Sequence, residues 1–289
     1  ASRAVGVARQ LIQPSSREAY HAETAAEYAK LRERRAGASK RKPQVGIEEA
    51  RANAMAIDWT GTAPQRPARP GLHVLDDYPL ETLVDYIDWT PFFRTWELAG
   101  RYPDILDDEV VGEAARNLYR DARDMLDRIV GEKWLRAKAV FGLYPAAARG
   151  DDVVLYADES RGTELETLNF LRQQRAKAGG RPNRCLADYV APANAGFEDY
   201  AGLFAVTAGL GIENKLAEFE AIHDDYHAIL LKALADRLAE AFAEHLHERV
   251  RKEFWGYAAD ETLDNEALIG EAYRGIRPAP GYPACPDHS

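Results

Sequence analysis

Apolar residues recur every three or four positions along two long stretches of the chain. The first covers residues 109–133 and the second residues 213–255, where Leu230 and Leu238 belong to the stripe. This spacing places the apolar side chains on one face of an α-helix. We therefore expect two long amphipathic helices, the second broken once near His223, and shorter helices over residues 17–35, 47–56, 80–87, 164–177 and 266–273.

Three other stretches carry the pattern of β-strands. Residues 139–144 and 153–156 are rich in apolar and aromatic side chains, and the Gly150-Asp151 pair between them suits a hairpin turn. Residues 200–207 form the third stretch. Strands separated by helices, with one hairpin, predict an α+β fold in which an antiparallel or mixed β-sheet is flanked by long helices.

The N-terminal forty residues differ in pattern from the rest. Residues 1–12 hold an apolar run too short for a core, and residues 13–42 are mostly charged, with Ser15 or Ser16 as a helix cap and a basic hinge over 37–43. A polar helix of this kind often bridges domains. We expect 1–12 to be the tail of a preceding domain, 13–42 a helical interdomain linker, and 43–289 a single large domain.

Composition narrows the class of protein. The net charge of −10 argues against a nucleic-acid-binding surface, which needs excess positive charge. No apolar run approaches the roughly 20 residues of a membrane span, and no signal peptide is visible. Cys185 and Cys285 give neither a disulfide framework nor a zinc-ribbon spacing. These features predict a cytoplasmic protein without nucleic-acid or membrane partners, and both chain ends look cut from something larger.

Four prolines stand within residues 277–286, near the end of the chain. Proline fixes its own φ and lacks an N–H donor, so this stretch is expected to be a stiff, extended loop. Arg277 offers a planar fork suited to a carboxylate, Gly281 lets the backbone approach a neighbour, and Tyr282 offers a flat ring. The loop fits a ligand clamp, although composition alone favours a connector.

Several acidic residues allow two interpretations. Asp88 lies among aromatic residues just before Pro91, where it is either the cap of the next helix or a ligand contact, and the cap is favoured. Asp236 and Glu240 are four residues apart on the long helix. They form either a solvated helix face or an acidic surface for a partner or cationic ligand, and spacing alone does not separate these interpretations.

Two short motifs resemble known sites only in part. His223 and His227 have the i, i+4 spacing of a metal-binding helix, but no third ligand is obvious and a polar helix face is favoured. The Gly209-Leu210-Gly211 stretch ends a strand and opens a helix, as a nucleotide-binding loop does. Its third glycine is missing, so a tight strand-to-helix turn is favoured. We expect no metal site in this chain.

Longer strings carry a specific resemblance that runs along nearly the whole chain. They resemble the C-terminal reactivation domain of cobalamin-dependent methionine synthase, and residues 1–7 look like the end of its cobalamin-binding domain. The strings are 85–93 (DYIDWTPFF), 108–112 (DEVVG), 223–226 (HDDY), 232–255 (KALADRLAEAFAEHLHERVRKEFW) and 275–288 (GIRPAPGYPACPDH).

The resemblance implies a site for S-adenosylmethionine. Asp88 falls on the acid that contacts the ligand's amino group, Arg277 on the arginine that holds its carboxylate, and Glu240 on a glutamate near the amino end. Ala279 and Gly281 lie in the loop whose backbone meets the adenosine, and Tyr282 falls on the tyrosine near the sulfonium. The resemblance places Asp236 at the surface that faces the cobalamin domain. It also implies that the family domain continues beyond Ser289, so this chain is expected to be incomplete at its C-terminus.

The resemblance also implies the reaction. In that family, S-adenosylmethionine supplies a methyl group and a reduced flavodoxin-like flavoprotein supplies an electron to reactivate cobalamin held by the neighbouring domain. Zinc belongs to the homocysteine-binding region, which is absent from this chain. Two alternatives remain: a non-catalytic docking module that recognises a cobalamin or flavoprotein partner, and a metal-dependent hydrolase that uses His223 and His227.

Overall fold

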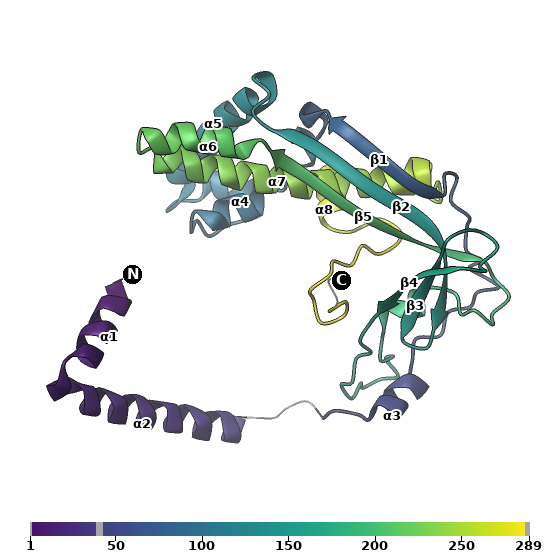
Figure 1. The fold of residues 1–289 in the computed structure, drawn as a ribbon, viewed down its shortest axis with the longest axis horizontal. Helices are drawn as coiled ribbons and strands as arrows, with labels where there is room; N and C mark the ends of the chain where they lie inside the picture. Colours follow the sequence, from purple (N-terminus) through teal and green to yellow (C-terminus); the bar gives the residue numbers. More distant parts are fainter. Residues whose placement is uncertain (1, 39–42, 287–289) are drawn as a thin grey trace. The chain divides into compact units, whose positions relative to one another are not determined.

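The computed structural model describes residues 2–38 and 43–286 and divides the chain into two compact units (Figure 1). One unit contains residues 1–55 and 172–184, and the other contains residues 56–171 and 185–289. The hinge predicted over residues 37–43 falls largely on 39–42, which lie outside the described residues. None of the described helices is long and apolar enough to cross a membrane.

The smaller unit begins with two helices, α1 (Ser2–Ile12) and α2 (Pro14–Ala38), and continues with α3 (Ile47–Ala52). The prediction that Ser15 or Ser16 caps the second helix is wrong. Pro14 occupies the first helical position, where its missing N–H is not needed, and the hydroxyl of Ser16 donates backwards to the carbonyl of Gln13. Residues 172–184 are irregular, and Asn53 binds the side chain of Asn183 at 2.7 Å.

The larger unit is built on a five-stranded antiparallel sheet. Its strands lie in the order β1-β2-β3-β4, with β5 on the free side of β2. The predicted hairpin and the strand over 200–207 are confirmed. The bounds are β1 (Gly71–Tyr78), β2 (Arg136–Arg149), β3 (Asp152–Tyr156), β4 (Glu164–Asn169) and β5 (Asp199–Leu210).

Strand β2 organises the sheet because it is long enough to pair with three others. Its first part lies between β1 and β5, and its last four residues pair with β3. Along β2, Ala137, Ala139 and Phe141 are buried in the main core and alternate with the more exposed Lys138 and Val140. One face of the sheet therefore packs against helices, as period-2 alternation requires, and the α+β prediction is confirmed.

Helices supply the rest of this core. They are α4 (Trp89–Thr95), α5 (Gly112–Gly131), α6 (Ile212–Ala221), α7 (Asp225–Arg249), which continues into the π-helical segment Val250–Phe254, and α8 (Asn265–Ile269). Single 3₁₀ turns cover Leu80–Thr82, Val84–Tyr86, Asp104–Asp107 and Leu186–Tyr189. Figure 1 shows α7 running along the sheet formed by β1, β2 and β5, with α6 beside α7 beyond the end of β5.

The predicted break in the long helix is confirmed. His223 has a φ of +56°, which ends α6 before α7 begins, and Asp224 caps α7 by accepting a bond from the backbone N–H of His227. Two other predictions are wrong. The stretch expected to be a helix over 164–177 begins with strand β4, and the helix expected over 80–87 is two 3₁₀ turns. Strand β1 was not predicted.

Candidate functional site

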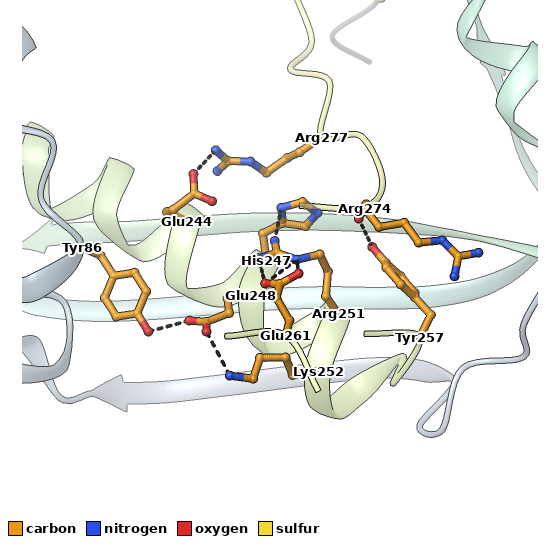
Figure 2. A network of polar contacts seen from close by, with 10 residues as sticks. All are labelled: Tyr86, Glu244, His247, Glu248, Arg251, Lys252, Tyr257, Glu261, Arg274 and Arg277. Atoms are coloured by element: carbon orange, nitrogen blue, oxygen red, sulfur yellow. Dashed lines mark hydrogen bonds and ion pairs between the residues drawn. The ribbon is translucent and has the colours of Figure 1, made fainter. Parts of the chain in front are cut away.

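The last turns of α7, together with the π-helical segment that continues it, carry an unusual set of buried polar side chains. Glu244, His247, Glu248 and Arg251 have between 0 and 9% of their surface exposed, although charged residues are rarely buried without partners. Their spacing of three, four and seven residues places them on one side of the helix. We call these four residues the anchor face of α7. Figure 2 shows that each contacts a side chain from elsewhere in the chain or from its own face.

Arg277 is the first predicted ligand residue that this face holds. Its Nη2 donates to Oε2 of Glu244 at 2.7 Å (Figure 2), and the two side chains are 23% and 11% exposed. The other oxygen of Glu244 is buried and has no hydrogen-bond partner among the described residues. Burial raises the pKa of the Glu244 carboxyl, and the charges of Arg277 and Arg251 oppose that shift. The pair therefore sits where water screens charge weakly.

Arg251 contacts Glu261, His247 and Tyr273 next to this pair. Its side chain is fully buried, and its Nε donates to Oε2 of Glu261 at 2.9 Å while Nη1 lies 2.8 Å from Nδ1 of His247. The guanidinium also stacks over the ring of Tyr273, 4.2 Å from its centre. Burial, with the neighbouring positive charges of Arg251 and Arg277, lowers the pKa of His247 to about 3. His247 is therefore neutral and accepts the bond from Arg251.

A glycine turn carries the chain from Tyr273 to Arg277. Gly275 has a φ of +108°, and a side chain there would meet the hydroxyl of Tyr257 at 2.8 Å. That hydroxyl donates to the backbone carbonyl of Arg274 at 3.3 Å. Only glycine fits both the backbone conformation and the close approach. The turn directs residues 276 and 277 back toward α7.

The proline-rich loop beyond Arg277 is different. It contains no helix or long strand, as predicted, but its end is folded rather than extended. Gly281 has a φ of +87° and donates to the carbonyl of Cys285 at 2.8 Å, and Cys285 donates back to Tyr282 at 2.9 Å. Ala279 is exposed, and Tyr282 is 66% exposed. These three proposed contacts with the adenosine and the sulfonium therefore lie on an open turn.

Asp88 lies in a second segment that α7 also holds. Its Oδ1 accepts the backbone N–H of Thr90 at 2.9 Å, so the predicted cap of α4 is present. Two residues earlier, the hydroxyl of Tyr86 donates to Glu248 at 2.6 Å, and Lys252 binds the same carboxylate at 3.2 Å. Capping uses one carboxylate oxygen of Asp88, and within the described residues the other accepts no bond.

The remaining predicted acids lie one and two turns earlier on α7. Glu240 and Asp236 are exposed, and Asp236 pairs with the adjacent Arg237 at 2.6 Å. Within the described part of the chain, no hydrogen bond joins Arg277 to either of them or to Asp88. The structure thus joins Arg277 to Glu244, which sequence reasoning passed over. No local signal marks Glu244, because a charged residue away from the apolar stripe has the pattern of a solvated helix face.

The polar helix face favoured for His223 and His227 is wrong, and the strand-to-helix turn favoured at Gly211 is confirmed. His223 lies outside α7, so it does not share a helical face with His227, and Nδ1 of His227 binds Asp224 at 2.7 Å. In the described ranges, no group of three or more metal-binding side chains is close enough to hold an ion. Gly211 has a φ of +94° between β5 and α6, which makes that stretch a tight strand-to-helix turn.

Comparison with known proteins shows the family of this chain. The family described as "Vitamin B12 dependent methionine synthase, activation domain" matches residues 79–289. Among solved structures, one titled "Crystal Structure of the MetH Reactivation Domain bound to AdoHcy" has 56% sequence identity and a TM-score of 0.81. That match covers 84% of this chain and 74% of the other. This chain belongs to the activation-domain family of vitamin B12-dependent methionine synthase.

Proposed function

We propose that this chain binds S-adenosylmethionine and presents its methyl group to cobalamin. The observation that carries the proposal is Arg277, fixed by a buried acid at the entrance of the proline-rich loop. The planar guanidinium of an arginine can donate two parallel hydrogen bonds to a carboxylate. The methionine part of S-adenosylmethionine carries such a carboxylate. The 56% identical relative was crystallised with AdoHcy, the demethylated form of the same ligand, which supports this choice.

The residues divide the ligand between them. Arg277 takes the carboxylate, and Asp88 offers the oxygen that capping leaves over to the α-ammonium, with Glu240 nearby on α7 as a second acid. The backbone at Ala279 and Gly281 lies along the adenosine, and the ring of Tyr282 faces the sulfonium, since an aromatic face attracts a cation. A zwitterionic end needs one acid and one cation, and the chain supplies both.

The reaction we propose is reductive methylation. Cobalamin in the neighbouring domain would take one electron from a reduced flavoprotein of the flavodoxin type, and S-adenosylmethionine held by this chain would supply the methyl group and leave as S-adenosylhomocysteine. Cobalt and sulfonium supply this chemistry. The present chain binds the donor, orients it and excludes water. Zinc and methyl transfer to homocysteine belong to other parts of a cytoplasmic methionine synthase.

The N-terminal residues fit the same proposal. We assign 1–12 to the tail of a cobalamin-binding domain, 13–42 to an interdomain linker and 43–289 to the reactivation domain. Asp236, 67% exposed on α7, is the residue that we place against the docked cobalamin domain. If docking were the only function, the chain would bind the isolated cobalamin domain but ignore S-adenosylmethionine.

Calorimetric titration of the 289-residue chain with S-adenosylmethionine tests the proposal. We expect saturable binding of one ligand per chain, with S-adenosylhomocysteine competing for the same site. Far-UV circular dichroism on the same sample establishes that the protein is folded. Folded protein that shows neither heat nor competition, with equilibrium dialysis confirming the absence of bound ligand, contradicts the proposal.

A further inference from the structure

The anchor face of α7 holds both segments that carry the charged ligand contacts. Glu244 binds Arg277, and Glu248 binds Tyr86, two residues before Asp88 (Figure 2). Glu244 and Glu248 are separated by one helical turn. The two charges proposed to receive the two ends of an amino acid are therefore connected to a single rigid element, although they are 189 positions apart in the sequence.

Glu244 occupies an unfavourable place for a carboxylate. The neighbouring positions Ala241, Phe242 and Leu246 are buried apolar side chains, and Glu244 itself is 8% exposed. One of its oxygens has no hydrogen-bond partner among the described residues. A buried acid without full hydrogen bonding is costly unless an opposite charge offsets the cost. Arg277 provides that charge at 2.7 Å.

The same contact restricts Arg277. Residues 274–279 form neither helix nor strand, so backbone structure alone does not fix this side chain. A guanidinium has five N–H donors in a fixed plane, and the bond to Glu244 uses one on Nη2. Donors remain for a second carboxylate. Holding the group in place beforehand lowers the entropy lost when a ligand binds.

We propose that Glu244 is a positioning residue of the S-adenosylmethionine site, holding the guanidinium of Arg277 ready for the ligand carboxylate. This inference rests on the proposed function. It differs from the opposite role that the same contact could have, in which Glu244 imitates the ligand and competes for Arg277. The two roles give opposite signs when the charge of Glu244 is removed.

The test compares two ligands on the same variants. S-adenosylhomocysteine has the amino-acid end, and 5′-methylthioadenosine has the same nucleoside and sulfur without it. Glu244→Gln keeps the size of the side chain but removes its charge. We expect Glu244→Gln to weaken S-adenosylhomocysteine about tenfold, the difference between a charged and a neutral hydrogen-bond partner, and to leave 5′-methylthioadenosine within about twofold of the unmodified chain.

Glu253→Gln is the matched control. Glu253 also accepts a bond from an arginine on the same helical stretch, since Nη2 of Arg249 lies 2.7 Å from its Oε2, but it does not contact Arg277. We expect this variant to bind both ligands as the unmodified chain does. Equal weakening of both ligands by Glu244→Gln would mean that Glu244 only supports the fold, and tighter S-adenosylhomocysteine binding would mean that it competes. Either result overturns the proposal.

A double-mutant cycle gives a second measurement if 5′-methylthioadenosine binds too weakly to follow. In the Arg277→Ala background, Glu244→Gln should change S-adenosylhomocysteine affinity less than twofold, because the group it positions is gone. A further tenfold loss in that background would contradict action through Arg277. Failure of the proposed function is distinct, because the unmodified, folded chain would then bind no S-adenosylhomocysteine.

Discussion

The two halves of the C-terminal stretch are held in different ways. Residues 257–277 are fixed by buried contacts, above all Arg251 with Glu261 and Glu244 with Arg277. Residues 278–286 close a small turn on themselves, and Tyr282 stays two-thirds exposed. If the chain binds S-adenosylmethionine as proposed, the contacts to the charged end of the ligand are already in place, whereas those to its nucleoside and sulfonium are completed on binding. Variants in the first half should change stability and affinity, and variants in the second should change affinity alone.

Arg251→Met should have the largest effect. It leaves Glu261, whose side chain is 7% exposed, without its arginine, and breaking a buried pair costs about 3–5 kcal/mol. Urea denaturation measures the loss. Arg149→Met is the control, because Arg149 and Glu164 are each about half exposed, and an exposed pair contributes no more than about 1 kcal/mol. Equal losses of unfolding free energy in the two variants would mean that the buried contacts of residues 257–277 stabilise the chain no more than an exposed ion pair does.

The lowered pKa of His247 predicts that the stability of the fold depends on pH. Its pKa in the folded chain is about 3, below the ordinary 6.5, so the unfolded chain binds this proton more readily. The stability from neutral His247 is present above pH 6.5 and is lost as the pH falls toward 3, by about 1.4 kcal/mol per pH unit. His247→Gln should remove this slope from denaturation curves measured between pH 5 and about 7. An unchanged slope would place the titration elsewhere.

Arg277→Ala tests the last of the buried contacts that hold residues 257–277. It should weaken S-adenosylhomocysteine binding by about 1.5–3 kcal/mol, the usual contribution of a hydrogen bond to a charged group. Arg274→Ala is the control, since Arg274 is exposed, lies three residues away and stacks on Tyr257. Calorimetry on both variants gives the comparison. Equal affinity for the Arg277 variant and the unmodified chain would remove Arg277 from the site.

Tyr282→Ala should have the smallest effect and only on binding. Because the ring is exposed, the free energy of unfolding should change by less than about 0.5 kcal/mol. Binding of S-adenosylmethionine should weaken by about 0.5–1 kcal/mol, since its sulfonium is positive. S-adenosylhomocysteine, whose sulfur carries no charge, should be affected less. Equal weakening of both ligands would show that the ring does not face the sulfonium.

The sequence predicted those elements whose burial follows a simple period. The hairpin from β2 to β3 was predicted correctly because its apolar residues, such as Phe141 and Val153, are buried. The break at His223 and strand β5 were also correct. Strand β1 was missed because its pattern is inverted: Leu72 and Val74 are exposed, while His73 stacks on Phe141. Strand propensity and the period of apolar residues describe a single segment. In β1, packing against the rest of the chain decides which face of the strand is buried.

Strand β4 is a second case in which the local apolar pattern did not predict the structure. Leu165 and Leu168 have helical spacing, which led to a helix prediction, yet half of Leu165 is exposed and Leu168 pairs with Val153 of β3. The open edge of β3 supplies hydrogen bonds that a local pattern does not reveal.

The candidate site was predictable only in part. The resemblance supplied Asp88 and Arg277, but Glu244 and Glu248 became visible only once the structure showed what they hold. Their partners lie 33 and 162 positions away in the sequence. On the sequence alone, Glu244 and Glu248 have the pattern of a solvated helix face. Neither their burial nor their distant partners can be recognised from the neighbouring residues.

A crystal structure of this chain with S-adenosylhomocysteine would show whether Arg277 binds the ligand. We expect the ligand carboxylate within hydrogen-bonding distance of Arg277, with the bond from Arg277 to Glu244 retained and the turn around Tyr282 moved onto the nucleoside. A ligand bound elsewhere, or one whose carboxylate makes no contact with Arg277, would contradict that expectation.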